Sequence, residues 1–134
     1  MATGAQSSGQ FLASSIASIA AATKTTNFTS LVVPVWDVLE LMLQGEVTGG
    51  NASADGEVDF VLAGRIKDGG TWDTVAAFTL TLDLNGTTAV LESGQIDVQG
   101  FHSLKLLSVE NKDASYTATL VNLNWGKSYG FRCW

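Results

Sequence analysis

The only histidine, His102, and the only cysteine, Cys133, are the residues that could supply a nucleophile and its general base. A cysteine attacks as the thiolate, so an imidazole would have to lie within hydrogen-bonding distance to take its proton. His102 lies in a strand-like stretch with apolar neighbours, far in sequence from Cys133. The two could meet only if the C-terminal residues folded back onto that strand. We therefore interpret His102 as a packing residue and predict that the chain has no catalytic site and is not an enzyme.

Carboxylates recur at every second position from Asp55 through Glu57 to Asp59. Paired carboxylates can hydrolyse glycosides, and clustered oxygen ligands can hold calcium. Side chains two positions apart in a strand point to the same face, so all three carboxylates would lie on one outer face. The simpler interpretation is therefore a stripe of solvated carboxylates. A calcium ion bound by these three residues, or by Asp83 with Asn85, is an alternative. One histidine and one cysteine do not make a zinc site, and we predict no metal and no cofactor.

Composition limits the class of partner. The 134 residues have a formal net charge of -6, with 46% hydrophobic and 15% charged residues. A chain with so few basic residues lacks the positive surface that nucleic acids or anionic membranes require. A low-charge surface favours contact with another protein. We expect a single domain, made in a reducing cytoplasm because one cysteine forms no internal disulfide, and we do not predict a signal peptide.

From Leu31 onward, apolar residues recur at every second position, which is the period of a half-buried strand. Clusters of Gly, Asn, Asp and Ser separate these stretches at intervals of about ten residues. This pattern predicts an all-β fold, an antiparallel two-sheet β-sandwich with jelly-roll or immunoglobulin-like connectivity. The expected strands cover residues 38–47, 57–66, 72–84, 87–92, 96–98, 101–110 and 116–125.

Local signals add detail to these strands. Asn85 and Gly86 match a type I′ hairpin turn, so we expect the strand over 87–92 to pair with the strand before it. The adjacent apolar residues Leu106 and Leu107 predict a bulge or a strand buried on both faces. Pro34 places its stretch at a sheet edge or in a bend. Trp72 is in phase with the apolar positions of the following strand, which predicts a place in the core.

The first thirty residues are rich in Ala, Ser, Thr and Gly and contain a single charged side chain, Lys24. Their apolar residues fall near one face of a helix, but the stripe is too thin to form a stable helix alone. We predict an extended or weakly helical arm over 1–30, outside a sandwich domain over 31–134, that becomes ordered on a partner. The arm's expected contact residues are Phe11, Leu12, Ile16 and Ile19.

Aromatic residues crowd the C-terminus at Trp125, Tyr129, Phe131 and Trp134. Such clusters are typical of protein interfaces, and we predict that these four residues bind a partner. An exposed tryptophan such as Trp36 or Trp125 could instead stack on sugar rings. A carbohydrate-binding module is therefore the alternative from another class of function.

Residues 57–125 contain the segments "GTW" at 70–72 and "GFHSL" at 100–104, in an order that resembles head decoration (cement) proteins of tailed bacteriophages. The resemblance implies a jelly-roll β-sandwich that acts as a structural virion protein. It implies binding to the major capsid protein on the capsid exterior, stabilisation of that lattice, and a trimer or dimer. The arm over 1–30 would be the anchor. A tail or head-fibre component is the alternative among virion proteins.

Overall fold

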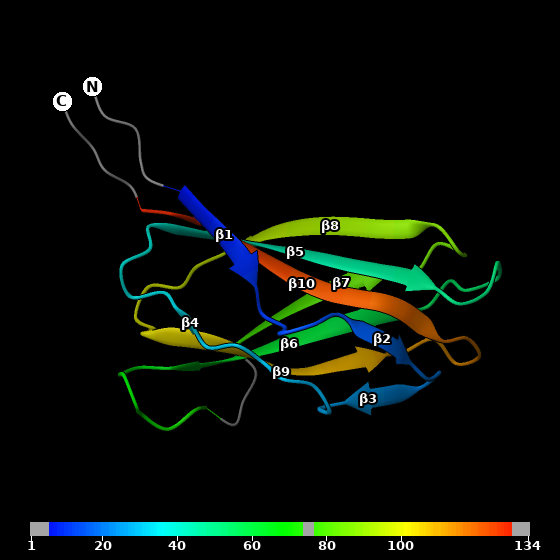
Figure 1. The fold of residues 1–134 in the computed structure, drawn as a ribbon, viewed down its shortest axis with the longest axis horizontal. Coiled ribbons are helices and arrows are strands. Elements are labelled where there is room, and N and C mark those ends of the chain that lie inside the picture. The colour runs from blue at the N-terminus through cyan, green and yellow to red at the C-terminus, as the bar shows by residue number, and fades with distance from the viewer. Residues whose placement is uncertain (1–5, 74–76, 130–134) are drawn as a thin grey trace.

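The computed structural model describes residues 6–73 and 77–129, in which every regular element is a β-strand (Figure 1). No helix that could span a membrane occurs within these residues. The strands are β1 (Gln6–Gln10), β2 (Ile16–Ile19), β3 (Thr23–Thr25), β4 (Val33–Pro34), β5 (Glu40–Gly49), β6 (Glu57–Arg65), β7 (Phe78–Asp83), β8 (Ala89–Ile96), β9 (Ser103–Asn111) and β10 (Ala118–Ser128).

The strands form two antiparallel sheets that pack face to face. The first sheet has the order β1-β10-β5-β8, and β2 also pairs with β10. The second has the order β3-β9-β6-β7, and β4 also pairs with β9. From β5 to β10 the chain crosses repeatedly between the sheets, as it does in jelly rolls. The predicted all-β sandwich is confirmed.

The core lies between the sheets and is built from the period-two apolar positions. Along β5, Leu41, Leu43 and Val47 point inward and are at most 1% exposed. The outward positions between them are exposed or half-buried. β6 contributes Phe60 and Leu62, both fully buried. Alternation of this kind fixes which face of each strand meets the core, because a shift by one residue would expose the whole apolar set.

The structure corrects the expected N-terminal arm, because residues 6–25 are part of the sandwich. β1 and β2 pair with β10, and β3 pairs with β9. Phe11, Leu12 and Ile19 are between 0% and 2% exposed, and all three belong to the core. The residues between these few apolar positions are mostly serine, alanine and glycine, so the apolar alternation that marks a strand is not visible in the sequence. Short edge strands form without it because they pair with longer strands.

The turn at Asn85 and Gly86 is present, but the predicted hairpin pairing is wrong. The Thr88 amide donates to the Asn85 carbonyl at 3.0 Å, and Gly86 has a φ of 57°. Asn85 does not have the positive φ that a type I′ turn requires. The turn carries the chain from one sheet to the other, because β7 pairs with β6 whereas β8 pairs with β5. A turn sequence specifies a local reversal and leaves the sheet partner open.

Two bulges interrupt the ladders. Ser108 pairs with Val61 and Leu106 pairs with Leu62, so Leu107 is the extra residue, which confirms the predicted bulge. In β10 the register shifts between Thr119 and Asn122, and Leu120 takes a φ of 51° there. Leu120 is also 64% exposed, so an apolar side chain stands on the outer surface at this bulge.

Trp72 lies on the outer surface of the second sheet, and Pro34 lies at its edge. Trp72 is half-buried but does not belong to the core. Arg65 Cζ and Lys105 Nζ lie 4.6 and 4.8 Å from the centroid of its ring, so two cations hold it on the surface of the second sheet. Pro34 lies in β4 at the edge of that sheet, as its missing amide hydrogen predicts.

Candidate functional site

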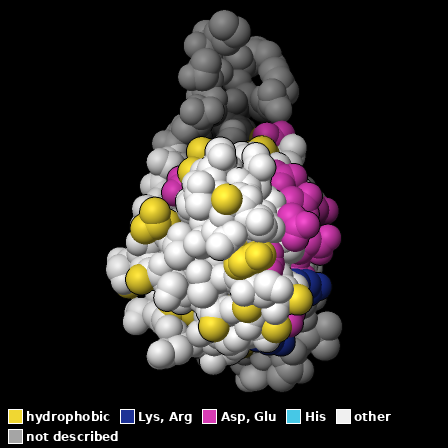
Figure 2. Space-filling model, turned by 90° about the vertical axis from the view of Figure 1, so that its right-hand side faces the viewer, with side chains coloured by type: hydrophobic (Ala, Val, Ile, Leu, Met, Phe, Trp, Pro, Cys, Tyr) yellow, Lys and Arg dark blue, Asp and Glu magenta, His cyan; other side chains and the backbone are white. Residues whose placement is uncertain are grey.

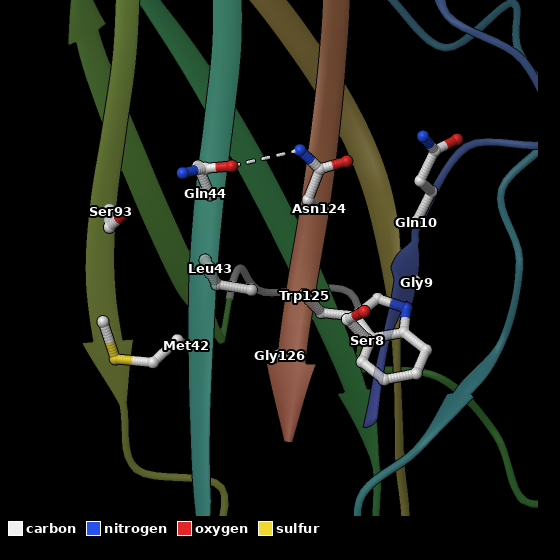
Figure 3. Close-up of a pocket in the computed structure, with 10 residues that line it drawn as sticks. All are labelled: Ser8, Gly9, Gln10, Met42, Leu43, Gln44, Ser93, Asn124, Trp125 and Gly126. Carbon is white, nitrogen blue, oxygen red and sulfur yellow. Dashed lines mark hydrogen bonds between the residues drawn. The ribbon is translucent and has the colours of Figure 1, made fainter. Parts of the chain in front are cut away.

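The outer face of the first sheet carries a row of polar side chains that crosses four strands. Gln10 of β1 pairs with Asn124 of β10, Asn124 with Gln44 of β5, and Gln44 with Ser93 of β8. Figure 3 shows these side chains side by side on neighbouring strands. We call this set (Gln10, Gln44, Ser93 and Asn124) the amide row. Residues far apart in the sequence thus meet because the strand register aligns them.

A shallow hollow lies beside the amide row. Its volume is about 480 Å³. A second hollow of about 450 Å³ shares Ser8, Met42 and Gly126 with it, lies farther along the same strands and is also lined by Glu40 and Lys127. We call the first hollow, which crosses four strands, the trough. Gly126 opens this trough, since no atom lies within 4 Å of the place where its Cβ would be. Besides the amide row, the first hollow is lined by Ser8, Gly9, Met42, Leu43, Trp125 and Gly126.

Hydrogen bonds orient the two central amides of the row. Asn124 Nδ2 donates to Gln44 Oε1 at 3.3 Å and to Glu46 Oε1 at 3.0 Å. The Gln44 oxygen is therefore engaged, and its Nε2 group remains a donor. Asn124 Oδ1 remains an acceptor. The pair presents both kinds of hydrogen-bonding group in fixed orientations, as recognition of a polar, uncharged ligand requires.

Charge is distributed unevenly between the two outer faces. Among the described outward positions of the first sheet, only Glu40 and Glu46 are charged. The outer face of the second sheet carries most of the charged strand residues. Figure 2 shows the end of the molecule that lies on the right in Figure 1, and there acidic side chains gather along the right-hand side of the view. The charged residues at outward positions of the second sheet include Glu57, Asp59, Arg65, Asp83, Lys105 and Glu110.

The predicted acidic stripe is partly neutralised. Asp59 is only 8% exposed and accepts a hydrogen bond from Thr81 Oγ1 at 2.7 Å. Its Oδ2 lies 2.8 Å from Lys112 Nζ, and this hydrogen bond raises the pKa of Lys112 above its usual range. Asp55 and Glu57 are exposed. Within the described residues, no three His, Cys, Asp or Glu side chains come together as a metal site would require.

A second surface feature is an apolar edge formed by residues 31–39, which connect the last part of the N-terminal region to β5. Val33, Val35 and Val38 point into the core. Lys127 Nζ binds the Pro34 carbonyl, and the Val35 amide donates to the His102 carbonyl at 2.8 Å, so the segment is held against both sheets. Its outward apolar side chains are Leu31, Val32, Trp36 and Leu39, which are 43–67% exposed.

The residues predicted to bind a partner are placed differently from the expectation. Phe11, Leu12 and Ile19 lie inside the core, where no partner can reach them in the folded chain. Ile16, Trp125 and Tyr129 are partly buried and pack against the core. The Tyr129 hydroxyl lies 3.0 Å from Ser7 Oγ, which joins β10 to β1. Phe131 and Trp134 lie outside the described residues.

Sequence reasoning missed the amide row and, apart from Trp36, the outward side chains of the apolar edge. Gln44 and Asn124 were only outward polar positions in separate strands until the register placed them side by side. Two adjacent apolar residues such as Leu31 and Val32 signal that at least one faces outward, and both are exposed here. That signal was available in the sequence.

Within the described part of the chain, His102 contacts Ser103 and Trp36. Its Nδ1 lies 2.6 Å from Ser103 Oγ. Its ring stacks on Trp36, with centroids 6.4 Å apart. Cys133 lies outside the described residues. The imidazole thus supports the exposed indole of the apolar edge.

Comparison with known proteins shows the fold and no family. No family model matches the sequence, and no curated protein matches it. The xylan-binding domain CBM22-1 of Paenibacillus barcinonensis Xyn10C is 16% identical over 97% of this chain and 98% of its own, with a TM-score of 0.50. A chain of the infectious bursal disease virus Gx strain is 13% identical over 93% of this chain and 32% of its own, with a TM-score of 0.50. The shared feature is the jelly-roll-like sandwich.

Proposed function

We propose that this chain is a structural virion protein that decorates a capsid by binding the outer face of the major capsid lattice. The observation that carries the proposal is the apolar edge, where Leu31, Val32 and Trp36 stay exposed on a rigidly held segment. Exposed apolar side chains gathered in one segment are typical of protein interfaces. Trp36 is the natural anchor of such a contact, because buried tryptophans dominate binding energies.

Two further findings support a capsid as the partner. The segments at 70–72 and 100–104 resemble those of phage head decoration proteins. The sandwich fold is also found in a chain of the infectious bursal disease virus Gx strain. We propose that the protein is made in the host cytoplasm and then bound on the capsid exterior as a trimer or dimer. Repeated weak contacts on a lattice then add up through avidity.

A double variant, Leu31→Asp with Val32→Asp, tests the contact. Both side chains are exposed, so the fold should persist while the desolvation of two carboxylates opposes binding. The measurement is co-sedimentation with capsids assembled from the major capsid protein of the same genome. We expect wild type to co-sediment and the variant to lose at least about tenfold in affinity, which is about 1.4 kcal/mol.

A matched control replaces Leu91 and Leu120 with Asp, since both leucines are exposed on the outer face of the first sheet. The control should bind as wild type does. Equal binding by the apolar-edge variant would show that another surface meets the capsid. Failure of wild type to bind capsids would reject decoration altogether, and gold labelling on tails instead of heads would favour a fibre or tail component.

The amide row favours a second candidate function, a carbohydrate-binding module. This function uses the first sheet, which is a different surface from the apolar edge, so the two proposals are compatible. Uncharged amides beside an open trough suit hydroxyl-rich ligands, and the sandwich is shared with a xylan-binding domain. Retarded migration in a native gel that contains dissolved polysaccharide tests this candidate. Identical migration with and without a panel of polysaccharides would count against it.

A further inference from the structure

We propose that the trough of the first sheet binds a neutral oligosaccharide whose chain runs across the strands. This inference rests on the second candidate function and adds the ligand's charge, its direction and the residues that determine both.

The direction follows from the strand register. The amide row runs from Gln10 to Ser93 across four strands. Neighbouring strands lie about 4.8 Å apart, so the row spans roughly 14 Å, a length suited to several sugar units. The next row toward the end of β10 contains Ser8, Gly126 and Met42 and runs parallel to it. A ligand lying along this second row would have the amides beside it over its whole length.

Gly126 provides the depth. A Cβ at this position would meet no atom within 4 Å, so the space above the backbone is open. Its φ is not positive, so a larger residue would fit the strand. Glycine at this position therefore serves no backbone conformation that other residues cannot adopt. Its effect is to leave the centre of the trough empty, where a ligand can approach the sheet.

Charge selects a neutral ligand. None of the described residues that line the first hollow is Lys, Arg, Asp or Glu. The adjoining carboxylate, Glu46, accepts a hydrogen bond from Asn124 and adds negative potential. An anionic sugar would therefore find no cation in this hollow, because Lys127 of the adjoining hollow is 7% exposed and its Nζ binds the Pro34 carbonyl. It would also meet a chain of net charge -6. Hydroxyl groups, in contrast, can use both the free donor of Gln44 and the free acceptor of Asn124.

Met42 supplies an apolar contact on the same trough. Its side chain is 41% exposed, and its flexible thioether can adapt to the C–H face of a sugar ring. Trp125 also lines the hollow, although its ring is half-buried against the core. Its fluorescence offers a built-in signal for an occupied trough.

The test is titration calorimetry, with Trp fluorescence in parallel, using xylohexaose and cellohexaose as neutral probes and hexagalacturonate as the anionic one. We expect binding of at least one neutral probe and none of the anionic probe. Gly126→Val should fill the trough without disturbing the fold, and Gln44→Ala should remove the central donor. Each should weaken binding by about tenfold or more. The control is Thr79→Val, on the outer face of the second sheet, which should bind as wild type does.

Two further variants, Gln10→Ala and Ser93→Ala, lie at opposite ends of the amide row and test the direction of the bound oligosaccharide. A ligand that crosses the strands should lose affinity in both. Loss in only one of them would overturn the direction. Neutral binding unaffected by Gly126→Val and Gln44→Ala, or preference for hexagalacturonate, would overturn the inference while leaving carbohydrate binding in place. Absence of binding to all three probes would reject both.

Discussion

The indole ring of Trp125 occupies the space that a side chain at Gly9 would need. The two residues pair across β10 and β1, and a Cβ on Gly9 would lie 2.5 Å from Cζ2 of the ring. Lys127 Nζ lies 4.8 Å from the centroid of the same ring. Trp125 is therefore held between β1 and the rest of β10. Trp125, which the sequence suggested for partner binding, thus also fastens the N-terminal strand to the last strand.

Gly9→Val should destabilise the fold through this contact. The added side chain would force the Trp125 ring to move, and overpacking of this kind costs about 1–3 kcal/mol. We expect a lower melting temperature and a shifted Trp emission. Gly126→Ala is the matched control, because its Cβ meets nothing. A Gly9→Val protein as stable as the control would mean that the ring does not lie against β1.

Phe11→Ala tests whether the N-terminal region belongs to the core. Phe11 is fully buried, so its truncation should cost about 3–5 kcal/mol in the free energy of unfolding. Chemical denaturation measures this change. Leu31→Ala, at an exposed position, should change stability by less than about 0.5 kcal/mol. Equal effects of the two substitutions would restore the picture of an arm outside the sandwich.

The sequence predicts the sandwich well where alternation is long. β5, β6 and β10 each carry several inward apolar residues, and each was expected near its observed bounds. β1 to β3 are short edge strands, and their few apolar residues fit a helical stripe as well as a strand. Phe11 and Leu12 are adjacent, which breaks the alternation that would have marked a strand. Pairing with β10 and β9 decides their structure, and that information is not local.

Asp113 joins two loops through its carboxylate. Its Oδ1 accepts hydrogen bonds from the amides of Ser115 and Tyr116, both at 2.9 Å. Its Oδ2 accepts from Gly56 at 2.9 Å and from Asp55 at 3.1 Å. The bonds from Ser115 and Gly56 lower the pKa of Asp113 the most, from 3.8 to about 2.

The lowered pKa predicts how stability depends on acid. The contribution of Asp113 is complete above the unfolded-state pKa of 3.8 and is lost as the pH falls toward 2. Asp113→Asn should cost about 1–3 kcal/mol at neutral pH, because it leaves buried amides poorly satisfied, and should flatten this acid dependence. Melting curves from pH 2 to pH 7 measure both effects. Asp68→Asn, at an exposed position, should keep the wild-type slope, whereas an unchanged slope in Asp113→Asn would contradict the assignment.

Leu120 has a strained backbone conformation, and its exposed side chain gains no burial energy that would offset the strain. A φ of 51° costs a non-glycine residue about 1–2 kcal/mol, and Leu120 is 64% exposed. Leu120→Gly should therefore match or exceed wild-type stability. Leu120→Ile should lower stability by about 1 kcal/mol, because a β-branched residue tolerates this conformation less well. The reverse order in thermal denaturation would show that β10 has no such bulge.

The candidate site is harder to read from sequence than the fold. The amide row depends on the register of four strands, and each of its residues is an ordinary outward polar position by itself. The pairing of β8 with β5 brings Ser93 beside Gln44, whereas the hairpin expected from Asn85 and Gly86 would have paired β8 with β7. Local turn chemistry therefore misplaces one end of the row, and no period in the sequence corrects it.

Cryo-electron microscopy of virions whose genome encodes this chain tests the central proposal most directly. We expect density for the sandwich on the outside of the head, with Leu31, Val32 and Trp36 against the capsid shell and the amide row facing solvent. Density with the amide row against the shell, or virions that lack the protein, would contradict the account.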